Sequence, residues 1–208
     1  MLTHTPASFW DKHAESYSRR PIADEAAYRK KLEVTRGYFQ PQTEVIEIGC
    51  GTGSTAIAHA PYVKRIRAVD VSSGMLEIAR KKAEAAGIDN VSFERAAVED
   101  LEVEAASIDV VLALSLLHLL EDKEATIAGV YDMLKPGGVF VTSTICLGDT
   151  MKFFKYIGPI GRFLGLMPTV EVFTVEQLER SLTAAGFLID YRWQPARGKA
   201  QFIVAKKA

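Results

Sequence analysis

The chain has 208 residues, of which 48% are hydrophobic and 25% are charged, and its 25 basic and 26 acidic side chains give a formal net charge of -1. This balance lacks the basic excess of proteins that follow a phosphate backbone, so it argues against nucleic acid as a partner. A chain of this length buries enough apolar surface to fold without disulfides or a metal ion, and we expect one domain over residues 1–208.

Residues 1–42 predict two helices ahead of the core. Ser8 and Asp24 are residue types that cap helix N-termini, and we expect the two helices to begin near them. The second helix carries a narrow inward stripe at helical spacing, formed by Tyr28, Leu32, Thr35 and Phe39.

Beyond residue 42, short apolar runs alternate with helical patterns. The runs expected to form strands are 43–48, 65–69, 91–93, 108–114 and 139–143. Gly87 indicates the end of one intervening helix, and Leu134-Lys135-Pro136, followed by two glycines, indicates the end of another. The alternation predicts an α/β fold with a mainly parallel sheet that is covered on both faces.

The C-terminal part predicts a capped helix and a hairpin. Thr174 and Gln177 have the spacing of a capping box, and Gly186 indicates where the helix ends. Residues 187–193 and 201–205 have the composition of strands, and the turn-rich residues between them favour a terminal hairpin.

Residues 45–54, VIEIGCGTGS, place three glycines directly after an apolar, β-branched stretch. Gly49, Gly51 and Gly53 lack a Cβ, so the backbone there can take angles closed to other residues and a ligand can lie against the main chain. Asp70 ends the next predicted strand about 20 residues later, where α/β nucleotide-binding units place the carboxylate that holds ribose hydroxyls. The two signals together predict a nucleotide-like ligand.

The spacing of this turn disfavours a dinucleotide. Dinucleotide-binding turns read G-x-G-x-x-G or G-x-G-x-x-A, whereas here Ser54 holds the sixth position and the third glycine comes one place early. NAD is therefore disfavoured, and a nicotinamide-dependent oxidoreductase is kept only as an alternative.

At this point the chain resembles the class I S-adenosylmethionine-dependent methyltransferases, in particular the bacterial group that acts on small molecules. The E-x-G-x-G-x-G core is present, and four further blocks follow in the family's order: AVDVSSGML, FERAAVEDL, DVVLALSLLHLLED and MLKPGGVFVTST. The resemblance covers nearly the whole chain. It implies a single-domain, Rossmann-like sheet of seven strands whose last strand is antiparallel, with S-adenosyl-L-methionine as cofactor and S-adenosyl-L-homocysteine as product.

The resemblance also implies which residues hold the cofactor. Gly49 and Gly51 would lie along its methionine and ribose portions. Glu47 would face its ammonium group, directly or through water, unless Glu47 is an exposed strand carboxylate. Asp70 would accept both ribose hydroxyls, unless it only caps the following helix. The same motifs add Cys50, Gly53, Val71 and Met75, the last packing on the adenine or in the core.

At the adenine end the chain departs from the family's pattern. Ala97 holds the position where an aspartate is usual, so the backbone of Ala97 and Val98 and the carboxylate of Glu99 are the expected contacts. Ser115 and Leu116, after the fourth predicted strand, should line the sulfonium region.

His118, Tyr17 and Arg19 are the remaining candidates. His118 lies beside the expected sulfonium site and is the candidate general base, although a histidine in an apolar run is also a common structural residue. Tyr17 and Arg19 resemble lid residues of the family, which makes residues 1–42 a helical lid and Tyr17 a second catalytic candidate. A solvated helix end is the alternative for both.

Residues 146–172 are expected to form an insertion on the acceptor side. Positions 150–170 contain no acidic residue, three cations and many large apolar groups. This composition indicates an apolar acceptor pocket or peripheral contact with a lipid surface, and the alternative is a short amphipathic helix packed on the core.

Cys50 and Cys146 are too few for a disulfide framework or a zinc site, and we expect no metal. No apolar run reaches the ~18 residues of a membrane span, and the N-terminus lacks the features of a signal peptide. We therefore expect a cytoplasmic protein, monomeric or homodimeric, without stable membrane insertion.

The predicted function is methyl transfer from S-adenosylmethionine to a small-molecule or lipid-like acceptor, at an oxygen, nitrogen, carbon or sulfur atom left undetermined. A protein that binds S-adenosylmethionine without turnover is the alternative that the departure at Ala97 supports.

Overall fold

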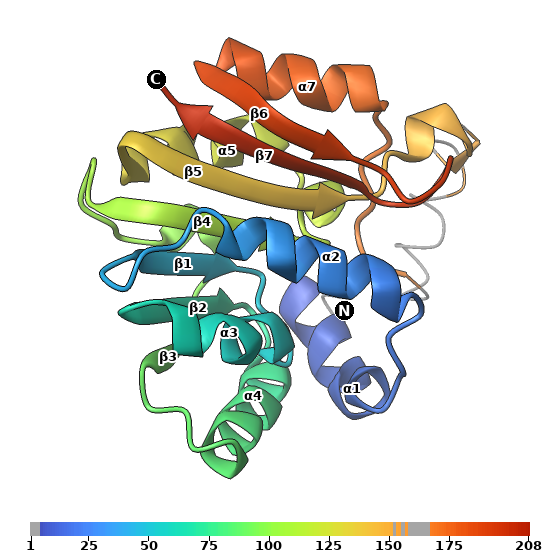
Figure 1. Ribbon diagram of the computed structural model, residues 1–208. Coiled ribbons are helices and arrows are strands. Elements are labelled where there is room, and N and C mark those ends of the chain that lie inside the picture. The colour runs from blue at the N-terminus through green and yellow to red at the C-terminus, as the bar shows by residue number, and fades with distance from the viewer. Residues whose placement is uncertain (1–4, 152, 155–156, 158–166) are drawn as a thin grey trace.

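The structure, a computed structural model, describes residues 5–151, 153, 154, 157 and 167–208. Its centre is a seven-stranded sheet in the order β3-β2-β1-β4-β5-β7-β6 (Figure 1). The parallel strands are β1 (Glu44–Ile48), β2 (Arg65–Asp70), β3 (Val91–Arg95), β4 (Ile108–Leu114) and β5 (Leu134–Thr144). The last strand, β7 (Gln201–Lys207), is antiparallel to both β5 and β6 (Phe187–Trp193). The predicted fold class is confirmed.

Helices cover both faces of the sheet. On one face lie α2 (Glu25–Arg36), α3 (Ser54–His59) and α4 (Ser73–Ala85), and on the other lie α5 (Lys123–Met133) and α7 (Val175–Ala184) (Figure 1). Alternate residues of a strand serve the two layers: Val45 packs in the core with Ala56 of α3, whereas Ile46 packs in the core with Ile127 of α5. Most residues on both faces of β1 and β4 are buried, as expected for strands covered on two sides.

The N-terminal helices begin where capping residues place them. The first helix, α1 (Pro6–Ser18), starts two residues before Ser8 because Thr5 caps it and Pro6 occupies its first position. Asp24 caps α2 as predicted, and its side chain accepts a hydrogen bond from the backbone of Ala27. In the inward stripe of α2, Leu32 and Thr35 are buried.

One carboxylate fastens α1 to the N-terminus of α4. Asp11 accepts the hydroxyl of Ser72 at 2.7 Å and the backbone N–H of Gly74 at 2.9 Å. These bonds lower the pKa of Asp11, the bond from Gly74 contributing most. Helix α1 is thereby held beside α4 at the edge where β1 and β2 end (Figure 1).

The predicted helix stop is confirmed, but β5 begins earlier than predicted. The structure ends α5 at Met133, directly before Leu134-Lys135-Pro136, and β5 begins at Leu134 and not at residue 139. Leu134 is fully buried and pairs with Ile108 of β4, with a register shift directly after this pair. Burial of this side chain against the neighbouring strand extends β5 through Pro136 and the two glycines.

The C-terminal predictions are confirmed. Thr174 and Gln177 form both hydrogen bonds of a capping box at the start of α7. The hairpin follows, with β7 extending two residues beyond the predicted strand.

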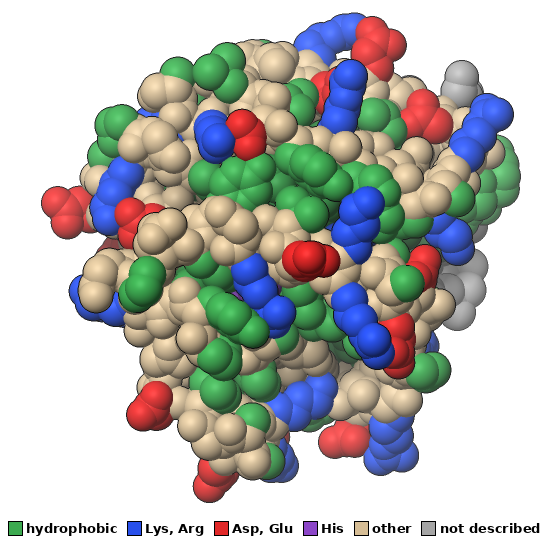
Figure 2. All heavy atoms as spheres, viewed as in Figure 1, with side chains coloured by type: hydrophobic (Ala, Val, Ile, Leu, Met, Phe, Trp, Pro, Cys, Tyr) green, Lys and Arg blue, Asp and Glu red, His purple; other side chains and the backbone are tan. Residues whose placement is uncertain are grey.

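On the face seen in Figure 2, basic and acidic side chains are interspersed. Within the described part of the chain, no helix has the length and apolar character that crossing a membrane requires.

Candidate active site

The glycine turn between β1 and α3 has the backbone that its sequence predicts. Gly49, Gly51 and Gly53 all have positive φ angles, of 68°, 53° and 72°. A Cβ at Gly49 would lie 2.7 Å from Cδ1 of Leu116, and a Cβ at Gly53 would lie 2.8 Å from side-chain atoms of Ala79 and Phe93. A Cβ at Gly51 would meet no atom within 4 Å, so Gly51 is the glycine that leaves space open above the turn.

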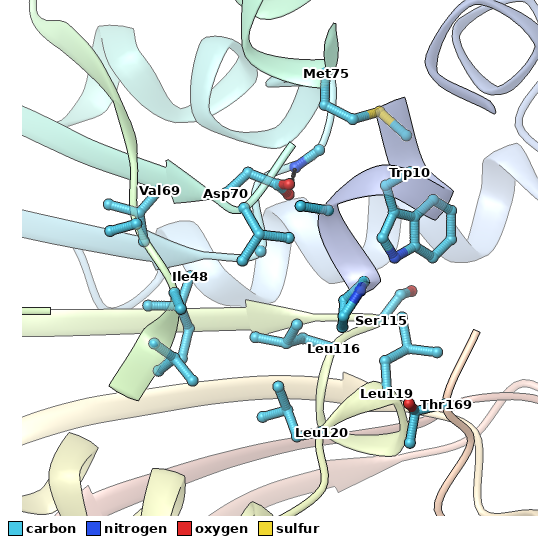
Figure 3. Close-up of a pocket in the computed structure, with 18 of the residues that line it drawn as sticks. Trp10, Ile48, Val69, Asp70, Met75, Ser115, Leu116, Leu119, Leu120 and Thr169 are labelled. Carbon is cyan, nitrogen blue, oxygen red and sulfur yellow. Dashed lines mark hydrogen bonds between the residues drawn. The ribbon is translucent and has the colours of Figure 1, made fainter. Parts of the chain in front are cut away.

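A cavity of about 440 Å³ lies at the carboxyl ends of β1, β2 and β4, with α1 forming one wall. Figure 3 shows Asp70 and Met75 on one side of it, Leu116, Leu119 and Leu120 on the opposite side, and Trp10 of α1 facing both. The predicted site residues that line this adenosine-sized cavity are Tyr17, Gly49, Gly51, Asp70, Val71, Met75, Ala97, Val98, Glu99, Ser115 and Leu116.

Asp70 is held in place by two backbone donors. Its Oδ2 accepts the N–H of Gly51 at 2.8 Å and its Oδ1 accepts the N–H of Ser72 at 2.9 Å. Burial raises the pKa of this carboxyl, while the two N–H groups act in the opposite direction. Ser72, and not Asp70, caps α4, because its hydroxyl accepts the N–H of Met75. Asp70 is therefore held in a fixed orientation in the cavity wall, and each oxygen keeps a lone pair for a hydroxyl.

The apolar end of this cavity agrees with the predicted adenine region. Ala97 and Val98 lie at the start of a 3₁₀ turn (Val98–Asp100) after β3, and both line the cavity with Glu99. Met75 is 2% exposed and lines the same space, so it belongs to both the core and the cavity wall.

A second cavity of about 550 Å³ lies on the other side of the glycine turn, beneath α2 and α3. Glu47 and Cys50 line this second cavity, and Tyr17, Gly49, Gly51, Leu114 and Ser115 line both. The two spaces thus meet at the glycine turn and the end of β4.

Glu47 is buried at the wall of the second cavity. It is 2% exposed, which overturns the alternative of an exposed strand carboxylate, and its Oε2 has no hydrogen-bond partner among the residues that the structure describes. Burial raises the pKa of Glu47 to about 8, although a hydrogen bond from the backbone of Ala56 opposes the shift. A buried carboxyl oxygen without a partner is costly, so this position suits a ligand that brings a positive charge or a donor.

Arg19, Gly53 and His118 line neither cavity. Arg19 pairs with Glu15 on the exposed side of α1, and Gly53 allows α3 to approach α4 and β3 closely. Nδ1 of His118 lies 2.9 Å from Oγ1 of Thr144 at the end of β5. The backbone oxygen of His118 accepts a hydrogen bond from the N–H of Glu171. Burial lowers the pKa of His118 to about 4.

Several wall residues were not predicted from the sequence. Trp10 and Thr5 of the α1 region close the first cavity, and Tyr28 and Lys31 of α2 line the second. Lys31 carried one usable signal, because it is a charged residue three positions after Tyr28 and directly before Leu32, two members of the inward stripe. Of the predicted insertion, residues 152, 155, 156 and 158–166 lie outside the described part of the chain.

The comparisons with known proteins agree with this geometry. Residues 45–138 match the family model for a methyltransferase domain. A malonyl-[acyl-carrier protein] O-methyltransferase of Priestia megaterium is 28% identical over 178 residues, covering 82% of this chain and 64% of the relative. A demethylmenaquinone methyltransferase of Symbiobacterium thermophilum is 27% identical over 176 residues, covering 80% of this chain and 68% of the relative.

The fold also matches solved structures. An S-adenosylmethionine-dependent methyltransferase of Mesorhizobium loti superposes with a TM-score of 0.70 at 20% identity, covering 88% of this chain and 98% of that one. The chain spans about two thirds of the length of the curated relatives named above. The chain thus contains a methyltransferase domain over residues 45–138, and it is similar to methyltransferases over most of its length.

Proposed function

We propose that this protein transfers the methyl group of S-adenosylmethionine to a small-molecule acceptor. The observation that carries the proposal is the pre-oriented carboxylate of Asp70, which crosses the mouth of a cavity that the open Cα of Gly51 and an apolar wall complete. A ribose with an apolar base at one end matches this combination.

The residues present fit the cofactor at both of its ends. Asp70 would accept the ribose hydroxyls, and Ala97, Val98 and Met75 would enclose the adenine. At the other end, Oε2 of Glu47 has no hydrogen-bond partner within the described part of the chain, and Glu47 lines the second cavity, where an ammonium group would lie. When bound, S-adenosylmethionine supplies a methyl group activated by its positive sulfur.

The chain's own contribution is positioning and the exclusion of water. Ser115 and Leu116 lie where the two cavities meet, with Leu116 packed against the Cα of Gly49. Holding the donor and the acceptor in line accounts for much of the acceleration of a displacement reaction. We propose that α1 and the α1–α2 connection, within residues 1–42, form the lid that completes this enclosure.

The acceptor class is supported by the relatives, whose names describe methyl transfer to malonyl-[acyl-carrier protein] and to demethylmenaquinone. We propose a small or lipid-like acceptor for this chain as well, reached from the side of residues 146–172. The comparisons favour this function over the nicotinamide-dependent oxidoreductase and over a binding protein without turnover.

A cytoplasmic location belongs to the same proposal. Cys50 and Cys146 are both free and buried in the structure, which agrees with a reducing compartment.

Calorimetric titration with S-adenosylmethionine, S-adenosylhomocysteine and NAD tests the cofactor. We expect the first two to bind and NAD to give no heat of binding. An assay of S-adenosylhomocysteine formation over a panel of carboxylic acids, quinols and amines then tests turnover. Binding of NAD in place of S-adenosylmethionine would contradict the proposal, and cofactor binding without turnover on any acceptor would favour the binding-protein alternative.

A further inference from the structure

A buried lysine lies outside both cavities, at the start of α5. Lys123 is 4% exposed, and its Nζ donates to Oε1 of Glu124 at 2.7 Å and to Oε1 of Glu171 at 2.6 Å. The ammonium also lies 4.8 Å from the centroid of the Phe173 ring, which is itself buried. Burial acts to lower the pKa of Lys123, but the two carboxylates outweigh it and raise this pKa. The lysine is therefore charged at neutral pH.

The position of Lys123 is unfavourable for a cation on two counts. It is the first residue of α5, where the helix dipole and the free N–H groups favour negative charge. Burial of an ion also carries a desolvation cost that its pairing must offset. A methionine of similar length would fill the same space without either cost, so the reason for a lysine lies in what its carboxylate partners hold in place.

The pairing of Lys123 with Glu171 connects α5 to the 167–173 segment, which precedes α7. The backbone of this segment is also hydrogen-bonded at two points. The N–H of Glu171 donates to the backbone oxygen of His118 at 2.8 Å, and the backbone oxygen of Phe173 accepts an N–H of the 3₁₀ turn after β5 at 2.9 Å. The ion pair thus adds a side-chain link at the residue that contacts the turn of His118.

The 167–173 segment forms part of the wall of the first cavity. Its residue Thr169 lines this cavity, and Figure 3 shows Thr169 on the same side as Leu119, opposite Asp70. Leu119 belongs to the 3₁₀ turn Leu117–Leu119, to which the segment is bonded through its backbone. Because the ribose of the cofactor is proposed to bind Asp70, this wall faces the side that is left for the acceptor.

We propose that Lys123 is a positioning residue for the methyl acceptor. Through Glu171 it holds the 167–173 segment against the turn Leu117–Leu119, and so fixes the wall that the acceptor contacts. Oε2 of Glu171 is buried without a hydrogen-bond partner in the described part of the chain, so loss of the lysine would leave this carboxylate without its counter-charge and favour its movement towards water. The inference rests on the proposed function, but it assigns no cofactor contact to the pair.

The test compares the two carboxylates that share Lys123. Lys123→Met and Glu171→Gln both break the link to the segment. Glu124→Gln is the matched control, because Glu124 lies in α5 beside the lysine, is 59% exposed and also accepts the hydroxyl of Ser181. Each protein is assayed with S-adenosylmethionine and the acceptor of the panel above that gives the most S-adenosylhomocysteine. Calorimetry with S-adenosylhomocysteine and amide exchange of residues 167–173 are measured on the same preparations.

We expect Lys123→Met and Glu171→Gln to lower kcat/KM for the acceptor by roughly 10- to 100-fold, mainly through KM. The affinity for S-adenosylhomocysteine should stay within about twofold of that of the unaltered chain. The double variant should resemble either single variant, because both changes remove the same link. Amide exchange of residues 167–173 should be faster in these variants and unchanged in β4. Glu124→Gln should alter none of these quantities.

An unchanged KM in both variants, or an equal rise in Glu124→Gln, would overturn the assignment. A parallel loss of S-adenosylhomocysteine binding would also overturn it, because it would indicate a general loosening of the fold. If Lys123→Met does not fold, Glu171→Gln decides alone, since it keeps the shape of the side chain. Absence of turnover by the unaltered protein on every acceptor would instead refute the proposed function, and unchanged exchange of residues 167–173 in Glu171→Gln would still overturn the link.

Discussion

Asp70 shows how a single carboxylate is prepared for a ligand before the ligand arrives. One oxygen accepts the N–H of Gly51, in the turn after β1, and the other accepts the N–H of Ser72, directly after β2. These two hydrogen bonds connect the glycine turn to the end of β2. A change at Asp70 is therefore expected to alter both the proposed ribose contact and the turn that supports it.

The variant Asp70→Asn tests this role with little change of shape. The amide must point its NH₂ group at one of two N–H donors, so it loses both the charge and one supporting bond. We expect S-adenosylmethionine to bind about 1.5–3 kcal/mol more weakly, the range for a hydrogen bond to a charged group. Calorimetry measures the change, with Asp100→Asn in the adjacent 3₁₀ turn as the control. An unchanged affinity would place the ribose elsewhere.

Glu47 gives a pH dependence of stability with a defined sign. Its pKa is about 8 in the folded protein against an ordinary value of 4.5, so the folded state keeps a proton that the unfolded state releases. The free energy of unfolding therefore falls as pH rises between these values, with a slope approaching about 1.4 kcal/mol per pH unit for this one group. Below pH 4.5 both states are protonated and the effect is absent.

We expect Glu47→Gln to stabilise the ligand-free protein at pH 8 and to be nearly neutral at pH 4.5. Urea denaturation at the two pH values measures the difference. Glu44→Gln, at the other end of β1, is the contrasting control, because Lys64 and Arg65 hold the pKa of Glu44 low and its replacement should destabilise most at high pH. Equal effects of Glu47→Gln at both pH values would mean that the carboxyl is ionised throughout.

The role of His118 as general base stays a prediction. The protonation and the position of its ring define what this role requires. The ring is neutral above a pKa of about 4, and Nδ1 is hydrogen-bonded to Oγ1 of Thr144. The role of a base requires the tautomer in which Nδ1 donates this bond, because Nε2 is then the nitrogen that can take a proton. Because His118 lines neither cavity, the turn formed by Leu117–Leu119 must shift when an acceptor binds.

His118→Asn keeps a polar group near Thr144 and removes Nε2. We expect it to lower turnover by roughly 10²- to 10⁴-fold, the usual contribution of a general base, while the affinity for S-adenosylhomocysteine is unchanged. Single-turnover rates and calorimetry on the same preparation separate the two quantities. Full turnover in this variant would assign His118 to holding the end of β5.

At the scale of elements, α1 forms a wall of the first cavity, and the side chain of Asp11 connects this helix to the start of α4. The hydrogen bonds from Ser72 and Gly74 to Asp11 hold α1 against α4. Trp10, also in α1, faces the first cavity (Figure 3). Loss of these bonds should loosen the wall more than the core.

Asp11→Ala should therefore lower the free energy of unfolding by only about 1 kcal/mol, as for other lost capping interactions. We expect a larger effect on α1 itself, seen as faster amide exchange of residues 6–18 and weaker binding of S-adenosylhomocysteine. Lys12→Ala, an exposed neighbour on the same helix, is the matched control. Unchanged exchange of α1 in Asp11→Ala would show that the helix is held by its apolar contacts alone.

Elements whose signals are local could be predicted from the sequence, and elements decided by packing could not. The strands, the glycine turn and the capping box of α7 follow from periodicity, glycine and capping chemistry within a few residues. The start of β5 was missed because burial of Leu134 against Ile108 is a contact across 26 positions. Trp10 and Lys31 were missed for the same reason, since only the docking of α1 and α2 brings them to the cavities.

At the scale of the whole molecule, the structure is built on one sheet, and the two cavities meet at the carboxyl ends of its central strands. The first is apolar and bounded by α1, and the second contains the ionisable side chains of Glu47 and Lys31 beneath α2. The division falls at the glycine turn and at Ser115, so β1 and β4, the central strands, position both halves.

Tyr17, at the end of α1, lines both spaces and is still 43% exposed. A ligand that moves this ring in one space changes the shape of the other, so the two occupancies are thermodynamically linked. Such linkage is reciprocal: whatever factor a group bound in one space gives to the affinity of the other space, a group bound there must return. We therefore expect two separate fragments of the proposed cofactor, one for each space, to bind cooperatively across this tyrosine.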